Sequence, residues 1–202
     1  MRAFSEASER NKQPILAVLR DYFSKPGTIL EIGSGTGQHA VYFAEQLPHV
    51  YWQPSDVQAN LAGIERWRQA SRLVNFHSAL ELDVSHQPWP VSKVDGVFSA
   101  NTAHIMSWPM VQDFIAGVGR VLRPNGHFCL YGPFNYNGQF SSPSNAYFDA
   151  SLRARDPAMG IRDFEAMNVL AEQAGLVLLA DHPMPANNQL LVWRKSAAST
   201  EV

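Results

Sequence analysis

The feature that most constrains the fold is a glycine-rich turn at residues 31–37, which reads Glu-Ile-Gly-Ser-Gly-Thr-Gly. It follows a short apolar run at residues 28–30 and precedes a segment whose apolar residues have helical spacing. A strand that leads into a glycine turn at the start of a helix is how open α/β sheets bind nucleotide-like cofactors. Glycines there let a ligand approach the backbone and allow a positive φ. The sequence therefore predicts an α/β fold with a cofactor site at this turn.

The rest of the chain alternates apolar runs with amphipathic segments, which indicates βαβ units and a mostly parallel sheet. The last two expected strands, 176–180 and 190–193, are separated by too few residues for a crossover helix, so we expect them to be antiparallel. The other expected strands are 28–32, 50–53, one within 74–82, 94–100 and 127–131. The expected helices are 8–23, 37–46, 57–70, 111–122 and 161–174.

The 202 residues fit a single domain, and a composition of 46% hydrophobic and 17% charged residues is typical of a globular protein. Within this domain, 1–202, we expect an N-terminal cap segment at about 1–25 and a frayed tail at 196–202. We also expect a long loop at about 132–144, and loops of this length are usually functional or mobile.

Several classes of protein are disfavoured by composition. The formal net charge of −2 indicates no general attraction to nucleic acid. No apolar run approaches the roughly 20 residues of a membrane span, and the N-terminus lacks the apolar core of a signal peptide. The single cysteine, Cys129, lies in an apolar run and is expected in the core. These features favour the cytoplasm, whereas the oligomeric state stays open.

Three candidate parts of a cofactor site follow expected strands. The first is the turn itself, with Gly33, Ser34, Gly35 and Gly37. The second is Asp56 after the second strand, where a carboxylate can accept bonds from ribose hydroxyls. The third is the pair Asp83 and Val84 after the third strand, which suits the exocyclic amine and ring nitrogen of adenine. Each aspartate has a structural alternative, since Asp56 can cap the next helix and Asp83 can cap a turn.

The charge of Glu31 separates two cofactor classes. A dinucleotide would bring an anionic pyrophosphate to the turn, which a carboxylate repels. S-adenosylmethionine (SAM) brings a sulfonium and an ammonium group, which a carboxylate attracts. A phosphate-binding P-loop is excluded, because Gln38 and His39 stand where Lys and Ser or Thr are required. The turn therefore favours SAM over a nicotinamide cofactor.

The predicted layout resembles the class I SAM-dependent methyltransferases. Four segments, 8–15, 53–56, 144–156 and 184–188, further resemble the family known as domain of unknown function 938, which is similar to the animal methyltransferase-like protein 26. The resemblance implies a Rossmann-like fold with a seven-stranded, mostly parallel sheet, an antiparallel last strand and helices on both faces. It also implies SAM binding with S-adenosylhomocysteine (SAH) as product, and it supplies no substrate.

In such methyltransferases the N-terminal segment often lies over the cofactor, and a backbone carbonyl after the fourth strand holds the methionine amino group. The resemblance thus implies that Arg10 pairs with the methionine carboxylate and that Asn101 supplies the carbonyl. Asn187 and Asn188, between the last two expected strands, are weaker candidates for site residues, since a tight turn explains them equally well.

The chemistry itself has few obligatory residues, because methyl transfer from a sulfonium is mainly a matter of positioning. His104 is the candidate general base, with a structural histidine as the alternative. Tyr131 is a second catalytic candidate. The remaining histidines show no metal-ligand spacing, so no metal is expected. A substrate pocket of Phe134, Asn135, Tyr136 and Tyr147 is a further prediction, with ordinary packing as its alternative.

The leading hypothesis is a SAM-dependent methyltransferase that acts on a small-molecule acceptor. One alternative is a SAM-binding protein without transferase activity, and another is a methyltransferase of protein or RNA. A nicotinamide oxidoreductase is the least favoured.

Overall fold

The glycine turn ends the first strand of a seven-stranded sheet in the computed structural model, which describes residues 4–197. The strands of this sheet are β1 (Gly27–Ile32), β2 (Val50–Asp56), β3 (Leu80–Glu81), β4 (Val94–Ala100), β5 (Leu122–Gly132), β8 (Leu176–Met184) and β9 (Asn188–Lys195). They lie in the order β3-β2-β1-β4-β5-β9-β8. Strands β1 to β5 are parallel, whereas β9 is antiparallel to both β5 and β8. The expected reversal of the last strand is confirmed.

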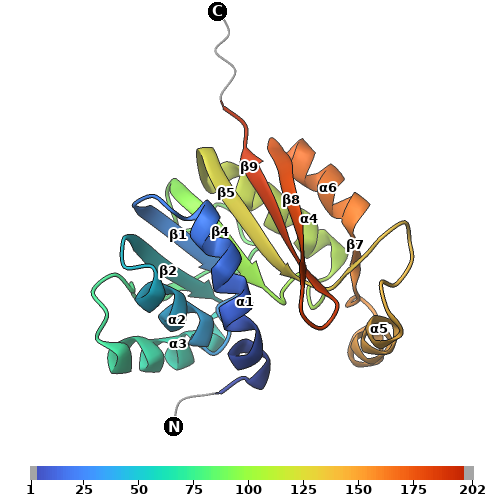
Figure 1. Cartoon of the computed structure of the whole chain (residues 1–202), viewed down its shortest axis with the longest axis horizontal. Coiled ribbons are helices and arrows are strands. Elements are labelled where there is room, and N and C mark those ends of the chain that lie inside the picture. The colour runs from blue at the N-terminus through green and yellow to red at the C-terminus, as the bar shows by residue number, and fades with distance from the viewer. Residues whose placement is uncertain (1–3, 198–202) are drawn as a thin grey trace, which may run out of the picture.

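Helices cover both faces of this sheet (Figure 1). They are α1 (Glu6–Tyr22), α2 (Gln38–Gln46), α3 (Gln58–Ser71), α4 (Trp108–Val121), α5 (Pro143–Arg155) and α6 (Phe164–Gln173). Helices α1, α2 and α3 pack on one face, and α4 and α6 pack on the other. Successive strand residues alternate between the two cores: Cys129 and Tyr131 of β5 face α1, whereas Phe128 and Leu130 face α4. The expected burial of Cys129 is confirmed.

Helix α4 shows how local sequence produces this layering. Ser107 caps its start by accepting a bond from the backbone N–H of Met110, and a proline occupies the first turn, where a missing N–H costs nothing. Its buried side chains include Val111, Phe114 and Val118, which fall on one stripe. Each fully buried apolar side chain of this kind contributes about 1.5–3 kcal/mol of transfer free energy.

Two expected elements differ in the structure. The third strand is only the two-residue β3, because upstream of it the chain touches β2 through a single bridge from Phe76 to Trp52. The expected loop at 132–144 holds a short strand, β6 (Phe134–Asn135), paired with β7 (Arg162–Asp163), and it leads into the unpredicted helix α5. That helix lacks a clear apolar period, since its buried residues are Asn145, Asp149 and Leu152.

The ends of the chain are described only in part. Residues 1–3 of the expected cap segment and 198–202 of the expected tail lie outside the described residues. The backbone N–H of Ser196 donates to the carbonyl of Gly175, which ties the end of β9 to the start of β8. Within residues 4–197, no helix has the length and apolarity needed to cross a membrane.

Candidate functional site

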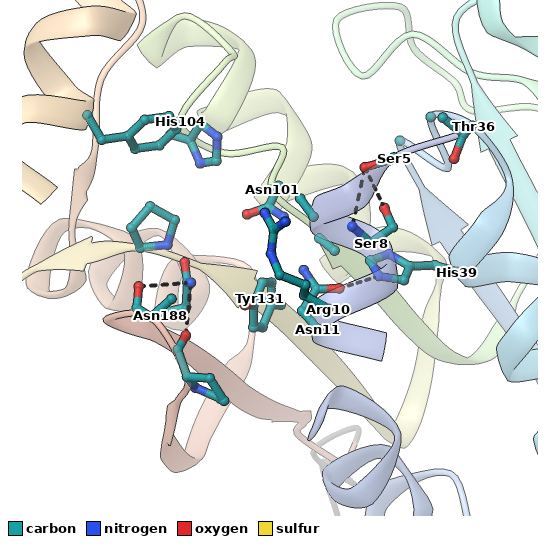
Figure 2. Close-up of a pocket in the computed structure, with 18 of the residues that line it drawn as sticks. Ser5, Ser8, Arg10, Asn11, Thr36, His39, Asn101, His104, Tyr131 and Asn188 are labelled. Atoms are coloured by element: carbon teal, nitrogen blue, oxygen red, sulfur yellow. Dashed lines mark hydrogen bonds between the residues drawn. The ribbon is translucent and has the colours of Figure 1, made fainter. Parts of the chain in front are cut away.

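A cavity of about 770 Å³ opens at the C-terminal ends of β1, β4 and β5. Its wall is formed by the first turns of α1, the glycine turn, the segment after β4, the start of α5 and the turn between β8 and β9. Open α/β sheets bind their ligands at this edge. Figure 2 shows His104 and Asn188 on one side, Ser5, Ser8 and Thr36 on the other, and Arg10, Asn101 and Tyr131 between them.

The glycine turn presents bare backbone to this cavity. Gly35 has a φ of 55°, and a Cβ built on it would meet nothing within 4 Å, so the space beside it is open. Gly33 has a φ of 73°, and a Cβ there would lie 2.5 Å from the Thr102 Cγ2 atom. Gly33 therefore allows the turn to pack against the segment after β4, whereas Gly35 leaves bare backbone beside open space. Ser34 also lines the cavity, whereas Gly37 does not line it and is the residue that precedes α2.

Glu31 lies beneath the turn, so its carboxyl is buried inside the protein rather than exposed to the cavity. It is 2% exposed, and its Oε2 atom accepts bonds from Trp52 Nε1 at 2.9 Å and Ser34 Oγ at 3.0 Å. The indole on the neighbouring strand β2 holds the carboxyl inside the protein. Burial raises the pKa of Glu31 to about 7, although the two hydrogen bonds oppose the rise.

Asp56 braces the turn from below. Its Oδ2 atom accepts a bond from the backbone N–H of Gly35 at 2.7 Å, and its Oδ1 atom accepts bonds from Val57 N and Asn60 Nδ2 at 2.8 and 2.9 Å. The carboxylate therefore supports the start of α3 and the glycine turn at once. An ionised carboxylate has about four acceptor positions, so these three bonds leave about one for a ligand.

Asp83 caps a turn, as its structural alternative predicts. Its Oδ1 atom accepts bonds from the Ser85 hydroxyl and backbone N–H at 2.6 and 2.9 Å, and these bonds lower the pKa of Asp83. Neither Asp83 nor the buried Val84 lines the cavity. They follow β3, which pairs with β2 beside Asp56. Their expected contact with adenine stays a prediction.

Arg10 and Asn101 both line the cavity, as expected. The Arg10 side chain is 71% exposed and lies 3.4 Å from Glu6 one helical turn earlier. In Figure 2 it runs from α1 toward Asn101. Asn101 has a φ of 59°, a left-handed conformation that asparagine tolerates better than most residues, and its N–H donates to the Tyr131 carbonyl at 2.9 Å. Their roles toward a cofactor stay predictions.

His104 also lines the cavity, and it is buried. Its ring packs edge-on against Phe148 of α5, with ring centroids 5.2 Å apart. Burial, and after it the positive charges of Arg162 and Arg155, lower the pKa of His104 to about 4. The imidazole is therefore neutral at pH 7. It can accept a hydrogen bond, but it is a weak base.

A family model described as "Protein of unknown function (DUF938)" matches residues 2–195. The chain belongs to this family. The resemblance that four separate sequence segments suggested is thereby confirmed over nearly the whole chain.

The chain is also similar to a curated protein and to several solved structures. The fatty-acid O-methyltransferase of Mycolicibacterium smegmatis is 30% identical over 101 residues, which are 50% of this chain and 35% of that protein. An O-methyltransferase family protein from Burkholderia thailandensis has a TM-score of 0.82 at 14% identity, covering 93% of this chain and 57% of that one. The structure of PigF with SAH has a TM-score of 0.76 at 17% identity, covering 90% and 61%. This chain thus spans about a third of the curated relative and under two thirds of the two structures. The structural likeness establishes a Rossmann-like methyltransferase fold.

The DUF938 chain also carries a buried polar network that sequence reasoning missed. Asn11 Oδ1 lies 2.7 Å from His39 Nε2, and the Asn11 side chain hydrogen-bonds the Tyr131 hydroxyl. His39 further bonds the backbone of Ser8, and burial lowers its pKa to about 4. The network joins α1, α2 and β5 at the floor of the cavity. The sequence does carry one sign of this network: Asn11 is a polar residue four positions before Ile15, on the buried face of α1.

A second set of hydrogen bonds, between Ser5 and Gln38, joins the start of α1 to the start of α2. The backbone N–H of Ser5 donates to Gln38 Oε1, and Gln38 Nε2 in turn lies 3.4 Å from the Ser5 carbonyl. Ser5 also caps α1 by accepting a bond from Ser8 N. The start of α1 is thereby fixed over the cavity beside the start of α2.

The four residues expected to form a substrate pocket do not line this cavity. Tyr131 lines the cavity, but Phe134, Asn135, Tyr136 and Tyr147 do not. Pairing of β6 with β7 turns Phe134 into the core, where it is 1% exposed. Asn135 is buried too, and Tyr136 donates to Asp181 at 2.6 Å, outside the cavity.

The aromatic wall comes from α5 instead. The helical turn directs Phe148 toward His104 and leaves the adjacent Tyr147 79% exposed. Pro133, Pro185 and Ala186 complete the apolar wall. Asn188 also lines the cavity, and its Nδ2 atom donates to the Pro185 carbonyl at 3.1 Å, whereas Asn187 does not line it. Within residues 4–197, no three His, Cys, Asp or Glu side chains are grouped so as to hold a metal ion.

Proposed function

We propose that this protein is a SAM-dependent methyltransferase that acts on a small-molecule acceptor. The observation that carries the proposal is the open backbone at Gly35, facing a cavity at the C-terminal ends of the parallel strands. The relatives support both parts of the proposal: one is a fatty-acid O-methyltransferase, and PigF is solved with SAH.

The residues around the turn fit SAM. The bare backbone from Gly33 to Gly35 would lie against it, and the remaining acceptor position of Asp56 would take a ribose hydroxyl. Arg10 would pair with the methionine carboxylate, and the Asn101 carbonyl would accept from the amino group. Glu31 beneath the turn would favour a cation above it once ionised. When bound, SAM supplies a methyl group already activated by its sulfonium.

The protein's own contribution is positioning and exclusion of water. Phe148 and Tyr131 line the cavity together with Asn101, and the hydrogen bonds from α1 to His39 and Gln38 hold that helix in place beside it. A preformed site of this kind lowers the entropic cost of bringing two reactants together. His104, neutral at pH 7, can accept a hydrogen bond from an acceptor molecule.

Calorimetric titration with SAM and SAH tests the proposal. We expect both to bind, and we expect Asp56→Ala to weaken them about tenfold or more, because a bond to a charged group contributes about 1.5–3 kcal/mol. Arg10→Ala should also weaken binding, whereas Arg20→Ala, farther along the same helix, is the matched control. Folded protein that binds neither ligand at high micromolar concentration would overturn the proposal.

Two further measurements separate the alternatives. Titration with NAD and NADP should give no heat if the cofactor is SAM. Labelled SAM added to a lysate should label the small-molecule fraction. Label found only in protein or RNA would show that the acceptor is a macromolecule and not a small molecule.

A further inference from the structure

The charge on the described wall of the cavity is of one sign, positive. Of the described residues that line the cavity, none is Asp or Glu, and Arg10 carries the only permanent charge. Glu31 is shielded beneath the floor, and Glu6, which contacts Arg10, has an 81% exposed side chain on the outside of α1. A ligand inside the cavity therefore meets positive charge that no lining carboxylate balances.

The His104 end of the cavity is also positive. Arg162 lies behind it, where its guanidinium donates to the carbonyls of Ala103 and Met106 and lies over the Trp108 ring. Those partners are neutral, so the charge of Arg162 is not cancelled by them. Arg155 adds a second positive charge close enough to lower the pKa of His104. The nearby carboxylate Asp149 acts electrostatically on both Arg162 and Arg153, and its oxygens accept bonds from Arg153 and the backbone N–H of Ile161, so it offsets only part of the positive charge at this end.

Helix α5 adds a dipole of the same sign. Ser144 and Asn145, in its first turn, line the cavity, and a helix N-terminus favours negative charge. One turn farther along, Phe148 lines the cavity, as do the apolar residues Pro133, Pro185 and Ala186. The cavity therefore combines positive potential with an apolar surface at its His104 end.

We propose that the methyl acceptor is a small carboxylate with an apolar body, seated between His104, Phe148 and the turn between β8 and β9. This rests on the proposed function and specifies its substrate class. A carboxylate would complement the uncompensated positive charge, and its apolar body would lie on Phe148. An amine that is protonated at neutral pH would be repelled by Arg155 and Arg162, the two positive charges that act on His104.

A carboxylate also suits the weak base in the site. An alcohol or phenol must lose its proton to react well, and His104 is far too weakly basic to take it. A carboxylate arrives already ionised. One of its oxygens forms the bond to the methyl carbon while the carbon–sulfur bond breaks and its electron pair stays on sulfur. The products are a methyl ester and SAH, with no proton, oxidant or reductant involved.

The test uses the full chain saturated with SAH, titrated with octanoate and 3-phenylpropionate and with the corresponding amides and amines. We expect the carboxylates to bind about tenfold or more tightly than the amides, because charge-assisted bonds are roughly twice as strong as neutral ones. Phe148→Ala should weaken carboxylate binding severalfold and leave SAH binding unchanged. Tyr147→Ala, its exposed neighbour, is the matched control and should change neither.

The outcomes distinguish the two proposals. Absence of SAH binding would overturn the proposed function. Intact SAH binding with amides or amines bound as tightly as the carboxylates would overturn only the acceptor assignment. In a second assay, SAM replaces SAH, and the corresponding alcohols are offered beside the two acids. Ester formation from the acids would support the assignment, and methylation of the alcohols alone would overturn it.

Discussion

Burial of Glu31 should make the protein less stable as pH rises toward neutrality. Its pKa is raised from 4.5 to about 7, so between these values the folded protein keeps a proton that the unfolded chain releases. The stabilising contribution is therefore fully present below pH 4.5 and is lost as pH rises through about 7. At about 1.4 kcal/mol for each pKa unit, the loss amounts to about 3 kcal/mol of unfolding free energy.

The substitution Glu31→Gln isolates this effect. Glutamine keeps an oxygen for Trp52 Nε1 and Ser34 Oγ but does not titrate. We expect the variant to gain about 3 kcal/mol relative to the parent between pH 4.5 and 8, measured by urea unfolding at closely spaced pH values. Contributions from groups present in both proteins, including His39 and His104, cancel in the difference.

A difference that stays flat across this range would refute the reasoning, because it would mean that the carboxyl titrates at its ordinary pKa. A difference that moves the opposite way would show that Glu31 is stabilised in its charged form. If the variant fails to fold, a ¹³C NMR titration of the Glu31 carboxyl in the parent protein gives its pKa directly.

Three further outcomes are expected. SAM should bind more tightly at pH 8 than at pH 6, because a sulfonium above the turn favours ionised Glu31, whereas SAH, which lacks that charge, should respond less; equal responses in calorimetry would contradict this. Asn11→Ala should lower the unfolding free energy by about 1–3 kcal/mol for each buried partner left without a bond, and unchanged urea unfolding would contradict the network. Gly35→Val should abolish SAM binding, since its side chain would occupy the open space at the turn, while circular dichroism shows a folded protein; undiminished binding would mean that the ligand lies elsewhere.

The sequence by itself determined the layered α/β fold and the edge of the sheet that carries the cavity. Both follow from local rules: alternating apolar periods define strands and helices, a glycine turn after a strand marks a ligand edge, and a short connection reverses the last strand. Each of those rules concerns residues close together in the sequence, so its pattern can be recognised without the tertiary structure. The glycine turn predicted Gly35 at the cofactor site, and Gly35 lines the cavity together with Asn101 and His104, which follow the fourth strand.

Only the tertiary structure decided where individual side chains point. Glu31 turns inward because an indole from the neighbouring strand donates to it, a contact between residues 21 positions apart. Phe148, rather than Tyr147, faces the cavity because of how α5 docks, and α5 itself has no clear apolar period. Asn11 meets His39 only once α1 lies across the sheet. Sequence patterns specify which face of an element is buried, whereas the partners of a polar side chain are set by how distant elements pack together.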